Sequence, residues 1–164
     1  DSIENVGFID ADLSTGFEDV KALVANLDNS INGQYMVFGS RKMNATDDIE
    51  RSKFRDLASN IVGFSIKQIM GLPISDTQCG AKLFKKSLAE KLFTDQFLTR
   101  WLFDVEIFFR MKNLYGERTM THAKELPLKA WKDIEGSKLS IVDSIKIPLM
   151  LSKIAYNYSA LKRA

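Results

Sequence analysis

Two aspartates close the first apolar run of the chain. Asp10 and Asp12 follow residues 6–9, Val-Gly-Phe-Ile, which are typical of a buried strand. Because alternate residues of a strand point to the same side, we expect both carboxylates to lie together where the strand ends. Such a pair suits a hard divalent cation that also holds phosphate oxygens. Taken alone, the triplet is more often a strand-end turn whose aspartate caps the next helix.

Basic residues that could hold a phosphate follow further along the chain. Arg41 comes directly after Gly39, where the missing side chain would let a ligand approach the backbone. Arg55 and Ser59 are four residues apart and therefore share one face of an expected helix, where they could cradle a phosphate. The plainer interpretation is a strand exit followed by a solvated basic helix face.

Acidic and lysine side chains surround a glycine in the middle of the chain. Asp76 begins a loop that ends at Gly80, and a loop of this kind can hold an acid rigidly beside a substrate or simply form a turn. Lys82 alternates with Gly80, so we expect its amine to point into the same cavity. We interpret Cys79 as a small buried hydrophobe, since no histidine lies near it in the sequence.

Five further polar residues lie at three places in the chain where a polar side chain suggests a role. Asp104 and Glu106 enter an apolar helix, where they must cap it, form ion pairs or serve a function. Ser137 and Lys138 lie in a polar loop that could close over a diphosphate or could be an ordinary surface loop. His122, the single histidine, is expected in a strand and is interpreted as structural.

Hydrophobic periodicity predicts an α/β fold that positions these residues. We expect one domain over residues 1–164, with a mixed sheet flanked by helices. The expected strands are residues 3–9, 35–39, 80–84 and 119–128, and the expected helices are residues 17–27, 52–70, 88–93, 103–115 and 141–158, the last interrupted at Pro148.

Composition excludes several classes of protein. The chain has 164 residues, is 45% hydrophobic and carries a net charge of +2, so it lacks the overall basic field of a nucleic-acid binder. Its single cysteine allows no internal disulfide and indicates no zinc site. No signal peptide is visible, and no run reaches the roughly 18 apolar residues that cross a bilayer.

The order and spacing of these motifs resemble one family. The segments run FIDADLST from Phe8, FGSR from Phe38, Arg55 with Ser59, DTQCGAKLF from Asp76, FDVE from Phe103, LPLKAW from Leu126 and GSKLS from Gly136. Together they are similar to GT-A-fold family 2 glycosyltransferases, and above all to the polyprenyl-phosphate (dolichyl-phosphate) mannosyl- and glucosyltransferases. The resemblance covers residues 6–149.

This resemblance implies roles for individual residues. The D-x-D aspartates would bind Mg²⁺ or Mn²⁺ against the diphosphate of a nucleotide sugar. The resemblance also implies that Arg41, Arg55 and Ser59 bind the acceptor phosphate. It implies a catalytic base at Asp76, with Asp104 as the second candidate. Ser137 and Lys138 would belong to a mobile loop near the acceptor. Some relatives have a glutamine two residues after the D-x-D, and Ser14 stands there in this chain.

The implied reaction transfers a hexose from UDP-glucose or GDP-mannose to a polyprenyl phosphate, with inversion. Because the acceptor phosphate is already ionised, Asp76 is expected to orient groups more than to remove a proton. The fold would be a partial GT-A domain that lacks the N-terminal nucleotide-binding βαβ units. We therefore expect weak or no activity from the chain alone, and a homodimer or swapped assembly through an exposed strand edge. Because the implied acceptor is a lipid, we also expect a location at the cytoplasmic face of a membrane.

Two alternatives stay open at this point. The chain could be a non-catalytic module that keeps the fold and uses its basic stripe and last helix at a membrane surface or with a partner. It could also be a family 2 transferase that uses a sugar hydroxyl as acceptor, although the pairing of Arg55 with Ser59 favours a phosphate.

Overall fold

The centre of the fold is a four-stranded mixed sheet. The computed structural model describes residues 3–30, 33–43, 63–129 and 141–161. The strands are β1 (Asn5–Phe8), β2 (Met36–Ser40), β3 (Lys82–Lys85) and β4 (Ala123–Pro127), arranged in the order β1-β3-β2-β4. β3 is antiparallel to both of its neighbours, and β2 is parallel to β4. The expected α/β fold with a mixed sheet is confirmed.

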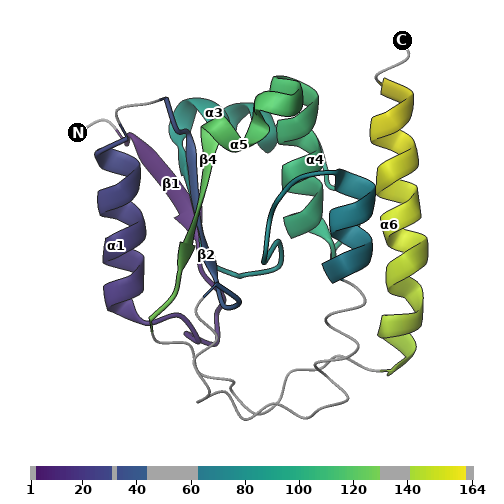
Figure 1. Cartoon of the computed structure of the whole chain (residues 1–164), viewed down its shortest axis with the longest axis horizontal. Helices are drawn as coiled ribbons and strands as arrows, with labels where there is room; N and C mark the ends of the chain where they lie inside the picture. Colours follow the sequence, from purple (N-terminus) through teal and green to yellow (C-terminus); the bar gives the residue numbers. More distant parts are fainter. Residues whose placement is uncertain (1–2, 31–32, 44–62, 130–140, 162–164) are drawn as a thin grey trace.

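Helices cover both faces of the sheet (Figure 1). α1 (Phe17–Asp28) packs against β2 and β3 on one face. On the other face lie α3 (Lys86–Leu92) and α4 (Phe103–Tyr115), and α6 (Ile141–Leu161) packs outside α4. Residues 63–70 are also helical, and η1 (Gly116–Arg118) and α5 (Thr119–His122) lead into β4.

The alternation of side chains on β2 divides the core into two parts. All five residues of β2 are buried. Met36 and Phe38 join the larger apolar cluster, where the Phe38 ring meets the Phe108 ring of α4 edge-on with centroids 4.9 Å apart. Val37 points to the opposite face and packs in a smaller cluster with Leu23 and Leu27 of α1. Each face of the strand therefore holds one helical layer in place.

The first strand differs from the expectation of a buried strand. β1 lies at an edge of the sheet, and its four residues are exposed or half-buried. The strand ends at Phe8, and the chain then turns, with the Leu13 amide donating to the Asp10 carbonyl (3.1 Å) and Leu13 at a φ of 56°. Asp10 and Asp12 are therefore placed by a turn, and strand alternation does not explain their relation.

The expected strand at residues 119–128 is wrong over its first four residues. Thr119–His122 forms a short helix, and the strand begins only at Ala123. His122 is thus helical, and its ring packs against the Tyr115 ring with centroids 4.2 Å apart. This contact, together with the Nδ1 contact to the Gly33 carbonyl (2.9 Å), outweighs the β propensity of the threonines around it.

Both expected ends of α4 are confirmed, whereas the expected interruption of the last helix is not. α4 has the expected bounds, and Gly116 follows it with a φ of 61° that favours glycine. α6 continues through Pro148, where an interruption was expected. Ile147 and Leu151 are buried on either side of the proline, so their packing holds the helix across the missing hydrogen bond.

Candidate active site

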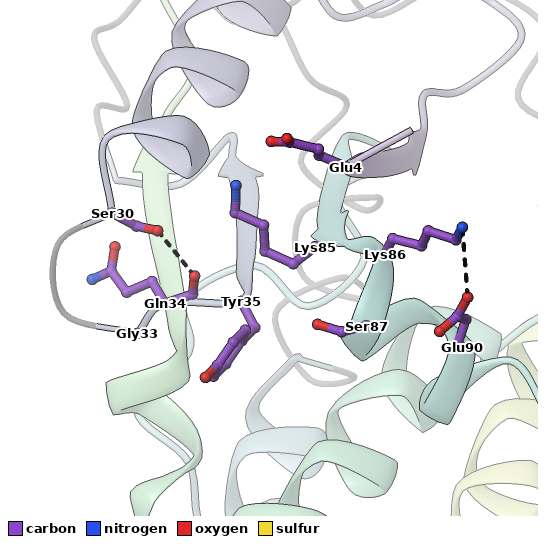
Figure 2. Close-up of a pocket in the computed structure, with 9 residues that line it drawn as sticks. All are labelled: Glu4, Ser30, Gly33, Gln34, Tyr35, Lys85, Lys86, Ser87 and Glu90. Carbon is purple, nitrogen blue, oxygen red and sulfur yellow. Dashed lines mark hydrogen bonds and ion pairs between the residues drawn. The ribbon is translucent and has the colours of Figure 1, made fainter. Parts of the chain in front are cut away.

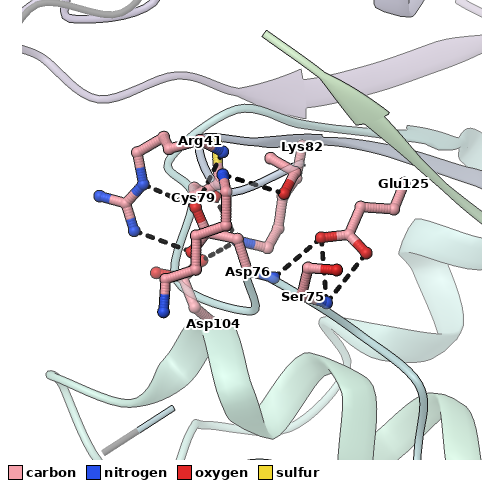
Figure 3. Close-up of polar contacts among 9 residues, drawn as sticks. Arg41, Ser75, Asp76, Cys79, Lys82, Asp104 and Glu125 are labelled. Carbon is pink, nitrogen blue, oxygen red and sulfur yellow. Dashed lines mark hydrogen bonds and ion pairs between the residues drawn. The ribbon is translucent and has the colours of Figure 1, made fainter. Parts of the chain in front are cut away.

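The chemistry-bearing residues meet at one end of the sheet. Arg41 follows the last residue of β2, Lys82 opens the antiparallel β3, and Asp104 lies in the first turn of α4. Because β2 and β3 run in opposite directions, the end of one lies beside the start of the other. Figure 3 shows how the loop with Asp76 completes this group.

Arg41 and Asp76 form a bidentate ion pair. The Arg41 Nε donates to Asp76 Oδ2 (2.7 Å), a terminal guanidinium nitrogen donates to Oδ1 (2.8 Å), and the Arg41 amide also donates to Oδ2 (3.1 Å). Burial opposes ionisation of Asp76, whose side chain is 3% exposed, but the hydrogen bonds and charge of Arg41 outweigh it and lower the pKa of Asp76. Asp76 is therefore a poor proton acceptor and a strong anchor for the guanidinium.

Glu125 of β4 fixes the loop that carries Asp76. Its carboxylate accepts the amides of Ser75 (3.0 Å) and Asp76 (2.8 Å), as Figure 3 shows. The sequence did not single out Glu125, because the loop that it binds lies 49 residues away. The one signal in the sequence was a charged side chain within an expected strand. Glu125 thus positions Asp76, and Asp76 in turn orients Arg41.

Lys82 and Asp104 form a second, more deeply buried pair. The Lys82 ammonium is fully buried and donates to Asp104 Oδ1 (2.7 Å) and to the Cys79 carbonyl (2.5 Å). Burial raises the pKa of Asp104, while the charge and hydrogen bond of Lys82 oppose that rise. We expected the Lys82 amine to point into the cavity at the Gly80 loop, but the amine is buried and its charge is satisfied inside the protein. This ion pair explains why an acid enters α4.

Asp10 lies close to this group of charges. Partial burial and the neighbouring charge of Asp12 raise the pKa of Asp10, whereas Lys82 and Arg41 lower it. A Cβ added to Gly80 would overlap the Asp10 carboxylate, so that side chain lies against the glycine. Glycine at position 80 therefore makes room for Asp10.

The D-x-D residues carry carboxylate oxygens, the ligand type that hard divalent cations prefer. Both residues keep surface open to solvent although Asp10 is partly covered, and Asp12 Oδ1 accepts the Ser14 amide (2.9 Å), which orients that carboxylate. In the described residues no group of three or more histidine, cysteine, aspartate or glutamate side chains could hold a metal ion. Two carboxylates leave coordination positions for water and phosphate oxygens, as Mg²⁺ requires. Partial burial and the charge of Asp12 raise the Asp10 pKa, and the charge of a bound cation would oppose that rise.

The structure brings together six of the ten predicted site residues. The six are Asp10, Asp12, Arg41, Asp76, Lys82 and Asp104. Arg55, Ser59, Ser137 and Lys138 lie outside the described residues. The interpretation of Cys79 as a buried hydrophobe is confirmed, because it is 1% exposed and burial raises the pKa of its thiol to about 11.

A separate hollow lies at the opposite end of the sheet. It has a volume of about 520 Å³ and lies beside the start of β2 and the end of β3 (Figure 2). Its lining includes Glu4, Tyr35, Lys85 and Lys86, and none of the six residues named above. The hollow is therefore distinct from the candidate site.

Sequence comparison relates the chain to curated proteins, although no family model matches it. It is 35% identical over 144 residues to a dolichyl-phosphate β-glucosyltransferase of Drosophila melanogaster, covering 83% of this chain and 41% of that protein. It is 32% identical over 164 residues to the Saccharomyces cerevisiae protein of that name, covering 91% of this chain and 47% of the other. The chain spans less than half the length of these relatives.

Structure comparison shows a fold that the chain shares with a solved protein. The chain superposes on Mycobacterium tuberculosis glucosyl-3-phosphoglycerate synthase with a TM-score of 0.60 and 14% identity, covering 94% of this chain and 51% of that one. A structure of that synthase with Mn²⁺, UDP-glucose and phosphoglyceric acid gives a TM-score of 0.58 at 15% identity, covering 94% and 50%. At this identity the likeness establishes the fold.

Proposed function

The chain belongs to the family of dolichyl-phosphate β-glucosyltransferases and has a GT-A fold. We propose that it forms the metal-binding and acceptor-side part of an enzyme that transfers glucose from UDP-glucose to a polyprenyl phosphate. In this reaction an acceptor phosphate oxygen attacks the anomeric carbon, the bond from that carbon to the diphosphate oxygen breaks, and the configuration inverts. UDP leaves with the electron pair of the broken bond.

The ion pair between Arg41 and Asp76 supports binding of the acceptor phosphate. Asp76 holds the guanidinium by two of its nitrogens, and the Arg41 side chain is still 22% exposed. An oriented guanidinium is suited to a phosphate anion. The low pKa of Asp76 agrees with an orienting role, since an ionised acceptor phosphate has no proton to remove.

The donor side of the proposed site rests on the D-x-D residues. Asp10 and Asp12 would hold Mg²⁺ or Mn²⁺, which would neutralise charge on the diphosphate. Asp104 is 15% exposed and remains our second candidate for the catalytic base, with Lys82 stabilising its ionised form. A neighbour of the same fold has been crystallised with Mn²⁺ and UDP-glucose, which supports this choice of cofactor and donor.

The proposal rests mainly on one observation, that three charged motifs lie together in a chain related to these glucosyltransferases. The D-x-D turn, the Arg41–Asp76 pair and the Lys82–Asp104 pair share one end of the sheet. Each motif alone has a plain structural explanation. Their meeting in space supports the proposal, because a cation site beside a phosphate-binding arginine is the arrangement that diphosphate displacement needs.

A chimera tests the proposal directly. We would replace the matched segment of the Saccharomyces cerevisiae relative with this chain and measure transfer of radiolabelled glucose from UDP-glucose to dolichyl phosphate in detergent, with GDP-mannose as control donor. Glucose transfer that Asp10→Asn abolishes supports the function. A chimera that folds but forms no product refutes it. Mn²⁺ binding by the chain itself, followed by electron paramagnetic resonance, tests the metal site independently of folding of the chimera.

Contact with a membrane surface follows from the proposed acceptor, which resides in a bilayer. In the part of the chain that the structure describes, no helix is long and apolar enough to cross a membrane. α6 nevertheless exposes Leu149 (72%) and Tyr156 (79%) on the side away from its buried residues. We propose that this face rests on the cytoplasmic surface of a membrane, and binding to vesicles, lost in Leu149→Glu, tests it.

A further inference from the structure

Lys42 brings a second positive charge to the Arg41 side of the candidate site. It follows Arg41 in the chain, and its amide donates to the hydroxyl of Ser40 (3.4 Å), the last residue of β2. Its side chain is half-buried, and its ammonium lies against the helix at residues 63–70, because a Cβ added to Gly63 would be 3.2 Å from the Lys42 Nζ. The side chain therefore lies between the end of β2 and that helix.

The Lys42 ammonium has no hydrogen bond or ion pair with the residues that the structure describes. The nearby carboxylate of Asp76 is affected by its charge: burial raises the pKa of Asp76, the hydrogen bonds and charge of Arg41 lower it, and the charge of Lys42 adds to the lowering. Both oxygens of that carboxylate already accept hydrogen bonds from Arg41. A half-buried ammonium in this position loses hydration without gaining a hydrogen bond, so a bound anion would stabilise it.

A narrow hollow contains Lys42 and the Arg41–Asp76 pair. Its lining includes the cations Arg41, Lys42 and Lys67, and Asp76 is the one acid among the described residues that line it. Arg41 and Asp76 offset each other, because they form an ion pair. Lys67 is exposed, so water screens its charge. The charge of Lys42 is therefore the one in this lining that is partly shielded from water and not offset by a described acid.

We propose that Lys42 is a second phosphate-binding cation for the acceptor, and that it makes the site selective for a phosphate monoester, with two negative charges, over a diester with one. The inference rests on the proposed function, in which the acceptor is a polyprenyl phosphate. The Arg41–Asp76 pair has no net charge, so it can orient a phosphate but cannot offset two charges. Neither D-x-D aspartate lines the hollow, which favours the acceptor phosphate over the metal-bound diphosphate of the donor.

Binding of soluble probes to the 164-residue chain tests the proposal without any transfer reaction. We would titrate the chain at pH 7.5 in metal-free buffer with geranyl phosphate and with its methyl ester, which carries one charge less, and follow the ³¹P resonance. Lys42→Gln should weaken binding of geranyl phosphate about tenfold, because a hydrogen bond between charged groups is lost. Binding of the methyl ester should weaken only about threefold, since the attraction to a single charge is half as large.

The pH dependence separates ligand binding from a change in folding. A phosphate monoester gains its second charge near pH 6. Although burial opposes both shifts, the ion pair raises the pKa of Arg41 and lowers that of Asp76, so these two groups keep their charges from pH 5 to pH 7.5. The affinity of the parent chain for geranyl phosphate should rise over this range, and the rise should be about threefold smaller in Lys42→Gln. The methyl ester should show no rise.

A matched variant and the chimera complete the test. Lys86→Gln, the same change at the opposite end of the sheet, should leave both affinities unchanged, and circular dichroism checks that each variant folds. In the chimera, Lys42→Gln should raise the KM for dolichyl phosphate but not for UDP-glucose, which identifies the bound phosphate as that of the acceptor.

Three results would overturn the proposal. They are an unchanged affinity of Lys42→Gln for geranyl phosphate, an equal loss of affinity for geranyl phosphate and its methyl ester, and a rise in the KM for UDP-glucose in place of that for dolichyl phosphate. A folded chimera that transfers no glucose would refute the proposed reaction and leave the binding result for Lys42 as it stands.

Discussion

The Arg41–Asp76 pair allows a quantitative prediction. Asp76→Asn keeps the size of the side chain but removes its charge and turns one acceptor oxygen into a donor facing the guanidinium. Asp76 is 3% exposed and Arg41 is 22% exposed, so the pair is largely shielded from water. Removing one partner of a buried pair costs about 3–5 kcal/mol, and we expect about 3 kcal/mol here because Arg41 retains some hydration. For a protein of this size that loss lowers the Tm by roughly 6–12 °C.

The pH dependence distinguishes this explanation from a simple packing defect. Since the folded state lowers the pKa of Asp76 below its ordinary value of 3.8, the pair contributes fully above that value. The contribution is lost as the pH falls through the lower pKa of the folded state. The stability difference between the parent chain and Asp76→Asn should therefore be large at pH 7 and shrink steadily below pH 4.

Urea unfolding of the two proteins at a series of pH values measures this difference. Asp95→Asn, which removes one charge at an exposed position, serves as the matched control and should change the stability by about 0.5 kcal/mol or less at pH 7. A penalty for Asp76→Asn that stays the same from pH 7 to pH 3 would refute the electrostatic reasoning.

Three further predictions concern other buried groups. Lys82→Met should lower the free energy of unfolding by about 3 kcal/mol because it leaves the Asp104 carboxylate buried without its partner, and Lys82→Met combined with Asp104→Leu should recover part of that loss in urea unfolding. Gly80→Ala should weaken Mn²⁺ binding in paramagnetic resonance, although both D-x-D carboxylates remain, because the added methyl group displaces Asp10; unchanged affinity would contradict the placement. Burial and a hydrogen bond to a buried carboxylate of α4 raise the pKa of Tyr158 to about 12, so ultraviolet titration should show a late phenol transition that Tyr158→Phe removes.

Sequence patterns predicted the fold well where packing follows local periodicity. α4 has the expected bounds because its apolar spacing and Gly116 both act locally. Patterns were less successful where a distant contact decided the outcome. Thr119–His122 is helical because the His122 ring packs against Tyr115, and α6 runs through Pro148 because buried side chains hold both of its halves.

The candidate site shows the same division. Residue types and their order were enough to single out the D-x-D aspartates, Arg41, Asp76 and Asp104, because those motifs are short and ordered along the chain. Which charges pair with which was not predictable. Lys82 was expected in a cavity, yet it is buried against Asp104, a residue 22 positions away that only the packing of α4 on the sheet brings near.

The sequence by itself determined the class of the protein, since composition, periodicity and the order of motifs depend only on the chain. The tertiary structure decided how the charges act. Glu125 reaches the loop of Asp76 across 49 residues, Asp76 orients Arg41, and β1 lies at an open edge of the described sheet. The physical reason is that ion pairs, pKa values and strand edges depend on distance and burial, and long-range packing sets both.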